Sequence, residues 1–239
     1  MPSPQPHGIE IVEIDRTAIA IEPWRWHFAV ERRDDIDRHF AALRQRRTGV
    51  WNGRVLLMQH YTIRDRVLQG ACFETDYASM CAWRDWNFPD AAVSNVFAGA
   101  AIRTADGAWL LGEMAANTAA AGLVYFPCGT PEPADIDADG RLDLTDNLKR
   151  ELKEETGLAF DELDAAPGWS VVIDRCYIAL VKRFTTRQSA DELQSRIARY
   201  LADERHPEFS RIRFVRAPGE LTASMPNFVI AFLEREWRQ

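Results

Sequence analysis

Three carboxylates near the middle of the chain have a spacing that suits metal-assisted chemistry. In the segment Arg150–Leu158, which reads RELKEETGL, they stand at Glu151, Glu154 and Glu155. The spacing i, i+3 and i+4 places them on one face of a helix. In a cleft, such carboxylates repel one another unless cations lie between them, and hard oxygen ligands suit Mg²⁺ or Mn²⁺. The alternative is a solvated Glu/Lys helix, on which the repulsion is small and screened.

The residues around these carboxylates predict the helix that must carry them. Asp143 or Thr145 can cap its first turn, and Gly157 can end it. An apolar stripe with a spacing of four residues runs through Leu144, Leu148 and Leu152. The helix therefore has one face for a hydrophobic core and another for polar groups.

The acidic segment before this helix has some features of a calcium-binding loop. Four places of the calcium-loop template are filled by Asp135, Asp137, Asp139 and Gly140. The last ligand place, however, holds Asp146 instead of a glutamate. Residues 126–134 contain three prolines where that template requires a helix. We expect a hairpin or surface turn at residues 137–140 instead.

Strands and helices alternate along the rest of the chain, which indicates an α+β protein. Asp-Gly at 106–107, between two apolar runs, predicts a β-hairpin. A turn signal at Asn87–Asp90 separates an N-terminal unit, 1–90, from a second unit, 91–239. Other expected strands are 9–14, 18–21, 54–61, 67–74, 123–127, 169–184 and 212–215. Other expected helices are 34–47, 77–86, 191–202 and 225–237.

Composition and charge exclude several classes of protein. The chain is 46 % hydrophobic and 27 % charged, with a formal net charge of −7 and no basic stripe of the kind that nucleic-acid binding needs. Its four cysteines form no C-x-x-C pair, which favours reduced thiols. No apolar run approaches the roughly 18 residues of a membrane span. We therefore expect a soluble cytoplasmic protein with no nucleic-acid or membrane partner.

Gly129 together with Arg150–Leu158 resembles the Nudix box, G-x5-E-x7-R-E-U-x-E-E-x-G-U, where U is an aliphatic residue. The second half matches at every specified position. Phe126–Gly129 looks like the strand end that leads into the box. The resemblance covers roughly residues 91–239. It implies a Nudix-type α/β/α sandwich with a mixed β-sheet, preceded by a smaller α/β N-terminal domain.

The first half of the box departs from the pattern. Counted forward from Gly129, the place of the box glutamate falls on Asp135, whereas counted back from Arg150 it falls on Leu142. The difference of seven residues indicates an insertion that carries the acidic turn. Asp135 and Asp143 are the two candidates to replace the missing glutamate.

The resemblance implies hydrolysis of a nucleoside diphosphate linked to another moiety, with Mg²⁺ or Mn²⁺ as cofactor. By position, Glu151, Glu154 and Glu155 would ligate the metal, and one of them would orient water as a base. Arg150 would position the carboxylates. The main-chain carbonyl of Cys128 would complete a metal shell.

Many members of the family use a further acidic residue far downstream. Glu208, just before an expected strand, is our first candidate, and Glu204 is the alternative. The competing interpretation of either residue is a surface carboxylate.

The N-terminal unit is rich in tryptophan, and its five indoles are Trp24, Trp26, Trp51, Trp83 and Trp86. We expect core or interface roles for them ahead of stacking on a base. Residues 51–58 and 74–80 are similar to segments that precede the catalytic domain in some bacterial Nudix proteins and in a relative acting on UDP-sugars. A nucleotide sugar is therefore one substrate to test.

Three functions compete. The leading one is a Mg²⁺-dependent Nudix pyrophosphohydrolase acting on a small-molecule nucleoside diphosphate derivative. The second is a Nudix-fold sensor or regulator that binds a nucleotide metabolite without turnover. The third is an interaction domain with an ordinary acidic helix. The sequence does not fix the oligomeric state, and a homodimer remains one option.

Overall fold

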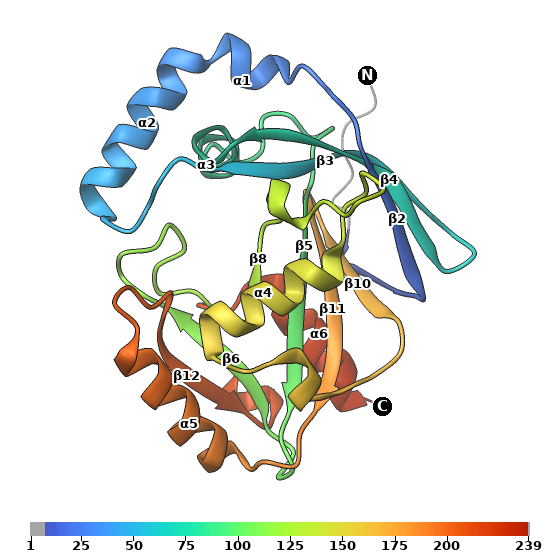
Figure 1. Cartoon of the computed structure of the whole chain (residues 1–239), viewed down its shortest axis with the longest axis vertical. Coiled ribbons are helices and arrows are strands. Elements are labelled where there is room, and N and C mark those ends of the chain that lie inside the picture. The colour runs from blue at the N-terminus through green and yellow to red at the C-terminus, as the bar shows by residue number, and fades with distance from the viewer. Residues whose placement is uncertain (1–7, 239) are drawn as a thin grey trace.

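A computed structural model describes residues 8–238 of the chain (Figure 1). Its larger sheet has the strand order β1-β10-β11-β5-β6-β12, with β7, β8 and β9 paired to β6, β5 and β11. The pair β11/β5 is parallel and the other pairs are antiparallel, so the sheet is mixed. The strands are β1 (Glu10–Ile14), β5 (Asn95–Arg103), β6 (Trp109–Met114), β7 (Val124–Tyr125), β8 (Cys128–Gly129), β9 (Asp164–Ala165), β10 (Trp169–Asp174), β11 (Tyr177–Thr185) and β12 (Phe209–Val215).

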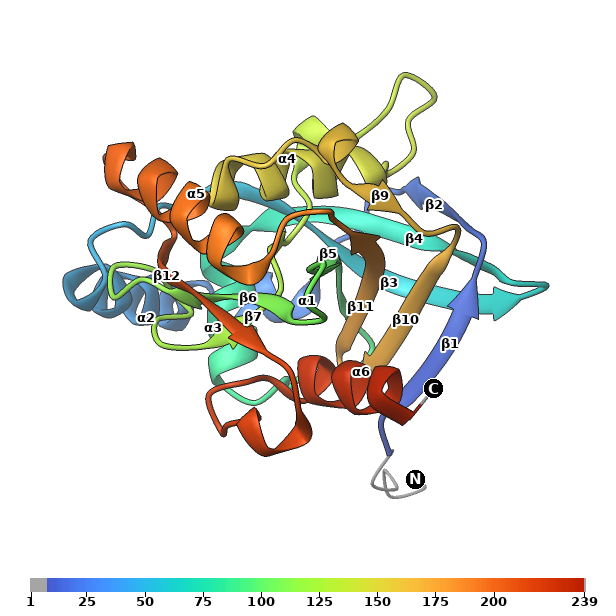
Figure 2. The same cartoon turned by 90° about the horizontal axis from the view of Figure 1, so that it is seen from below.

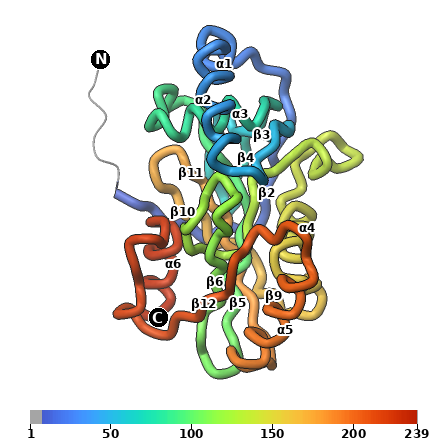
Figure 3. The backbone as a smooth tube through the Cα atoms, turned by 90° about the vertical axis from the view of Figure 1, so that its left-hand side faces the viewer, coloured from blue at the N-terminus to red at the C-terminus, as the bar shows by residue number. Residues whose placement is uncertain are grey.

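A smaller sheet has the order β2-β4-β3 and lies at one end of the molecule with α1, α2 and α3 (Figure 3). Its strands are β2 (Arg16–Ile21), β3 (Arg54–Arg64) and β4 (Val67–Asp76). The helices are α1 (His27–Glu31), α2 (Arg33–Arg46), α3 (Tyr77–Asp85), α4 (Leu144–Thr156), α5 (Ala190–Asp203) and α6 (Asn227–Arg238). Short 3₁₀ turns are η1 (Pro133–Asp135), η2 (Phe160–Glu162) and η3 (Pro218–Glu220).

The larger sheet is covered on both faces by helices, as the expected α/β/α arrangement requires. Figure 2 shows α4 and α5 on one side of the strands and α6 on the other. Successive side chains of a strand point to opposite faces, so the central strand β5 serves both cores. Ala98 and Ala100 pack in the cluster that contains the leucines of α4, whereas Phe97 and Ala101 pack in the cluster of α6. This double burial explains why β5 reads as a continuous apolar run.

The N-terminal residues are shared between the two sheets. Strand β1 pairs with β10 from Glu10↔Ile173 to Ile14↔Trp169, so it belongs to the larger sheet, whereas β2 belongs to the smaller one. Hydrophobic residues of both expected units also lie in one core cluster. The division into 1–90 and 91–239 stays a prediction, and residues 1–7 and 239 lie outside the described part.

One expected strand is wrong. Residues 169–184 form the hairpin β10–β11 instead of a single long strand. The chain reverses at Arg175, which adopts φ +55° although it is not a glycine. The only turn-favouring residue here is Asp174, which stands between two apolar runs, so the sequence signal is weak. The expected hairpin at Asp106-Gly107 is present between β5 and β6.

Across residues 8–238 there is no helix with the length and apolar character that crossing a bilayer demands. The four cysteines also lie in this range and none of them forms a disulfide.

Candidate active site

Helix α4 carries the carboxylates, and local sequence explains both of its ends. The Asp143 side chain accepts hydrogen bonds from the main-chain N–H of Thr145 at 2.8 Å and of Asp146 at 3.1 Å, so Asp143 is the cap. The helix ends at Gly157, which adopts φ +69°. The expected stripe of Leu144, Leu148 and Leu152 is buried and packs in the core with β5.

Two of the three carboxylates are buried. Glu151 is 7 % exposed and Glu155 is 1 % exposed, whereas the Glu154 side chain remains more than half exposed. Arg150 Nη1 lies 2.8 Å from Glu151 Oε1 and 3.3 Å from Glu154 Oε2. Glu155 Oε2 accepts from the main-chain N–H of Cys128 at 2.8 Å, but its Oε1 is buried without a partner. A buried carboxylate oxygen that lacks a donor is costly, so this atom is a place where a cation would be stabilising.

Asp135 orients the arginine. This carboxylate is 4 % exposed and accepts from Arg150 Nη2 at 2.9 Å, from Asn147 Nδ2 at 3.0 Å and from the N–H of Glu132 at 2.9 Å. Because Asp143 is occupied as the helix cap, Asp135 is the residue that contacts Arg150 at the end of the loop. Asp135, the position reached by counting forward from Gly129, is therefore the residue that pairs with Arg150.

The acidic segment after Asp135 forms the expected turn. Asp137 Oδ1 accepts from the N–H groups of Asp139 and Arg141, both at 2.9 Å, and Gly140 adopts φ +74°. A bridge between Ile136 and Leu142 closes this small hairpin. No helix precedes it, only η1, so the structure differs from a calcium-binding helix–loop–helix.

The smaller sheet holds the segment between Gly129 and α4 from two sides. At the β2 edge, the N–H of Leu142 donates to the Ile19 carbonyl at 3.0 Å, beside a bridge between Arg141 and Ala20. At the β3 edge, the N–H of Leu56 donates to the carbonyl of Pro131 at 2.8 Å. The segment between Gly129 and α4 is thus bonded to both edges of the smaller sheet, and its position depends on that sheet.

Gly129 lies against Glu151. A Cβ added at Gly129 would overlap the Glu151 carboxyl group, so the close approach of β8 to α4 needs a glycine. The neighbouring residue Cys128 is half-buried, and the pKa of its thiol is raised by burial and by the charges of Glu155 and Glu151.

The electrostatics of the site favour neutral carboxyl groups unless cations are present. Burial raises the pKa of Glu151 to about 8; Arg150 opposes this rise, and Glu208 and Glu154 add to it. The pKa of Glu155 is also raised well above its ordinary value. Burial is the largest cause, and the charges of Glu151 and Glu208 come next.

The charge of Glu208 is among the main causes that raise the pKa of Glu151 and of Glu155, whereas that of Glu204 is not. Residue 208 is exposed as a whole, yet partial burial of its carboxyl and the charge of Glu154 raise its pKa. Its carbonyl accepts from the N–H of Ala115 at 2.7 Å, which fixes it beside the end of β6.

Two tyrosines near the site were missed in the sequence. The pKa of Tyr125 in β7 is raised by burial and then by Cys128, Glu155 and Glu208. Tyr77, the first residue of α3, has a pKa raised by burial, with Glu208 among the lesser causes. Tyr125 stands within an apolar run and Tyr77 directly after a helix cap, so neither had a distinctive local signal.

The donor set suits a hard divalent cation, although the carboxylates do not converge. Among the described residues, no three His, Cys, Asp or Glu side chains gather closely enough to hold one ion. Arg150 contacts two of the three glutamates, and the main-chain N–H of Cys128 contacts the third. The unpartnered Oε1 of Glu155 and the oxygen-only chemistry nevertheless fit Mg²⁺ or Mn²⁺.

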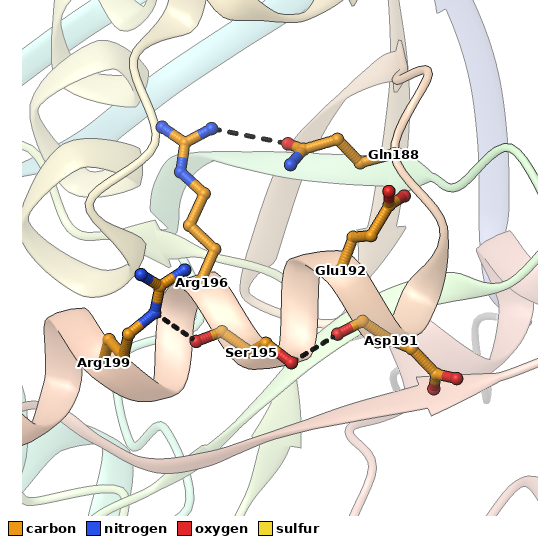
Figure 4. Close-up of a pocket in the computed structure, with 6 residues that line it drawn as sticks. All are labelled: Gln188, Asp191, Glu192, Ser195, Arg196 and Arg199. Carbon is orange, nitrogen blue, oxygen red and sulfur yellow. Dashed lines mark hydrogen bonds between the residues drawn. The ribbon is translucent and has the colours of Figure 1, made fainter.

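Surface depressions elsewhere do not offer an alternative site. One of about 380 Å³ lies over the end of α2, and one of about 450 Å³ lies beside α5 (Figure 4). The polar groups of the second already bond to one another: Arg196 Nη1 donates to Gln188 Oε1 at 3.4 Å and Arg199 Nε donates to the Ser195 carbonyl at 3.2 Å.

No family model matches the sequence, and no curated protein matches it either. Among solved structures, a Nudix hydrolase from M. smegmatis is 13 % identical, with a TM-score of 0.40 over 60 % of this chain and 84 % of the other. A MutT protein from Methanosarcina mazei Go1 is 21 % identical, with a TM-score of 0.40 over 61 % and 94 %. A NUDIX hydrolase from Nitrosomonas europaea is 18 % identical, with a TM-score of 0.37 over 61 % and 89 %. Likenesses of this degree do not establish a family, so the chemistry must be judged from the side chains of the site.

Proposed function

We propose that the protein is a Nudix-type hydrolase that cleaves the diphosphate anhydride bond of a nucleoside diphosphate derivative with the help of Mg²⁺ or Mn²⁺. The observation that supports this most directly is the buried pair Glu151 and Glu155, with Glu155 Oε1 left unpartnered. A cation would supply the missing partner and allow both groups to ionise near neutral pH.

In this proposal each side chain of the site has its own role. Glu151, Glu154 and Glu155 would hold the cation, which when bound neutralises the diphosphate and lowers the pKa of water. Arg150, held by Asp135, keeps the carboxylates in place. A water oxygen attacks one phosphorus, its proton passes to a carboxylate, and the bridging oxygen leaves with the other phosphate.

Glu208 is our candidate for the carboxylate that takes this proton. Its pKa is raised by partial burial and by Glu154, which makes it a stronger proton acceptor than an ordinary carboxylate. Glu204 serves as its matched control, because it is an exposed carboxylate of the same segment and is not among the main causes of the pKa shifts of Glu151 and Glu155. Glu208→Gln should lower kcat by about 100-fold or more, and Glu204→Gln should leave it unchanged.

The test is product release from a panel of nucleoside-diphosphate sugars, dinucleotides, coenzyme A derivatives and nucleoside triphosphates. Each compound is incubated with Mg²⁺, Mn²⁺ or EDTA, using wild type and Glu155→Gln. Turnover that needs the cation and is lost in the variant supports the hydrolase. Turnover that persists in EDTA or in Glu155→Gln would contradict it. Nucleotide sugars are the first group to measure.

A non-catalytic nucleotide sensor is the second candidate. The observation in its favour is that Glu151 and Glu154 are paired with Arg150 and do not form an open set of cation ligands. The sensor predicts cation-dependent binding of a compound from the same panel without release of product. The two functions are therefore separated by measuring binding and turnover on one sample.

A further inference from the structure

Helix α5 lies on the same face of the larger sheet as α4 (Figure 2). Tyr200, in its last turn, contacts the end of α4 at two places. A Cβ added at Gly157 would stand 2.6 Å from the ring atoms Cγ and Cδ2 of Tyr200, so the ring covers this glycine. The Tyr200 hydroxyl reaches further and donates to the main-chain carbonyl of Glu154 at 3.2 Å. A single side chain of α5 thus touches both the cap of α4 and the turn before it.

The hydroxyl bonds to one of the carbonyls that a helix cannot pair by itself. The last four carbonyls of an α-helix have no N–H partner within the helix. In α4 the first of these, at Lys153, accepts from the N–H of Gly157 at 2.9 Å, and the second, at Glu154, accepts from Tyr200. Water can also bond to an exposed carbonyl, so this hydrogen bond adds little to stability. What it adds is a fixed position for the end of the helix.

Helix α5 is a rigid support for this contact. It begins with a capping box, and three of its side chains are buried in the core cluster that also holds the leucines of α4: Leu193, Ile197 and Leu201. Tyr200 packs against the same cluster. The hydroxyl is therefore presented from a helix whose own position is set by the core.

The turn that Tyr200 contacts carries two of the three glutamates. The carbonyl that accepts its hydrogen bond belongs to Glu154, and Glu155 is the next residue. The side chain of Glu155 is held by the N–H of Cys128 at 2.8 Å, and its Oε1 is the buried oxygen without a partner. Rotation of this turn would move that oxygen. A misplacement of about 1 Å at a reacting group can lower a rate by about 100-fold.

We propose that Tyr200 is a positioning residue of the active site, which fixes the last turn of α4 so that Glu154 and Glu155 present their oxygens to the cation. This inference rests on the proposed function, which assigns these carboxylates to a cation. Tyr200 acts through the main chain of Glu154 and not on the substrate. Its loss should therefore weaken cation binding and lower kcat, without changing KM or the shape of the pH profile of kcat.

The test compares Tyr200→Phe, which removes only the hydroxyl, with Tyr61→Phe. Tyr61 lies in β3 and packs against the same core cluster, so its variant controls for the loss of a tyrosine hydroxyl elsewhere. Mn²⁺ is titrated calorimetrically into each full chain without substrate at pH 8. The values of kcat and KM are measured at saturating Mn²⁺ on a compound that wild type hydrolyses. Urea unfolding in EDTA compares the stability of the variants, and Tyr200→Leu removes the aromatic ring as well.

We expect Tyr200→Phe to weaken Mn²⁺ binding by about 2- to 10-fold, the equivalent of one hydrogen bond. It should lower kcat by about tenfold with KM unchanged. Tyr200→Leu should show larger losses, and Tyr61→Phe should match wild type in Mn²⁺ binding and kcat. The urea midpoints of Tyr200→Phe and Tyr61→Phe should agree, which separates a positioning role from a general loss of stability.

Wild-type Mn²⁺ affinity in Tyr200→Phe overturns the positioning role, and turnover in that variant leaves the hydrolase standing. A higher KM with unchanged kcat, or a pH profile of different shape, also overturns it. If wild type binds Mn²⁺ but hydrolyses nothing, weaker binding in Tyr200→Phe supports the positioning role without the hydrolase. A wild type that neither binds Mn²⁺ nor hydrolyses any compound overturns both proposals.

Discussion

Glu155→Gln should stabilise the fold at pH 8 when no divalent cation is present. Glu155 is 1 % exposed, one of its oxygens has no partner, and its neighbour Glu151 is also buried. The amide keeps the size of the side chain, and its oxygen can still accept from the N–H of Cys128. The substitution removes a charge that the buried pair disfavours, so the metal-free variant should unfold at a higher urea concentration than wild type.

The raised pKa of Glu155 gives the sign of the effect, and the neighbouring Glu151 contributes a pH dependence of the same sign to wild type and variant alike. The pKa of Glu151 is raised from its ordinary value of 4.5 to about 8 in the folded chain, so the folded state binds more protons than the unfolded state between these pH values. The free energy of unfolding therefore falls as pH rises through this window. At about 1.4 kcal/mol per pH unit, the loss reaches at most about 5 kcal/mol by pH 8. Below pH 4.5 the loss from this group is absent.

Urea unfolding followed by tryptophan fluorescence at pH 5, 6, 7 and 8 measures this directly. In EDTA, the difference between Glu155→Gln and wild type should grow with pH. Mg²⁺ at about 100 times its Kd should raise the free energy of unfolding of wild type by about 2.7 kcal/mol, and that of the variant by less. Glu154→Gln, on the exposed face of α4, is the control and should change stability by less than about 0.5 kcal/mol. A wild-type stability in EDTA that is flat from pH 5 to pH 8, with no gain in the variant, would refute the reasoning.

Two further predictions concern the loop before α4. Gly129→Ala should displace the Glu151 carboxyl group and lower kcat by at least about tenfold, with little change in KM. The control is Gly219→Ala, which should match wild type in the same assay because its added Cβ meets no atom within 4 Å. Asp135→Ala should lower the free energy of unfolding by about 3 kcal/mol, because it leaves a partly buried arginine and a buried amide without this acceptor. Urea titration measures the free energy of unfolding of Asp135→Ala, with Asp139→Ala in the exposed turn as the control. Equal decreases in the two variants would contradict the role of Asp135.

Local signals predicted α4 well. Its cap at Asp143, its end at Gly157 and its buried leucines all follow from interactions within a few residues of the helix. The burial of Glu151 and Glu155 did not follow in the same way, since the helical spacing fits a solvated face equally well. Only the packing of β8 and the core of β5 against α4 distinguishes the two cases.

Long-range contacts decide the features that the sequence left open. Asp135 and Asp143 were both candidates to replace the missing box glutamate, and the contact of Asp135 with Arg150 depends on a loop whose Leu142 bonds to Ile19, more than a hundred residues earlier. The reversal at Arg175 was missed because its one turn-favouring residue, Asp174, stands within a long apolar run. The exposure of Trp51 depends in the same way on neighbours that no local pattern predicts.

The pairing of β1 with β10 has a consequence for the order of synthesis. Glu10 pairs with Ile173, so β1 leaves the ribosome 163 residues before its partner. At about 5 to 20 residues per second, the delay is on the order of 8 to 30 s. All three strands of the smaller sheet end by Asp76, so that sheet can form during this interval and restrain β1, which is separated from β2 by Asp15 alone. The first strand to be made is therefore among the last to be paired.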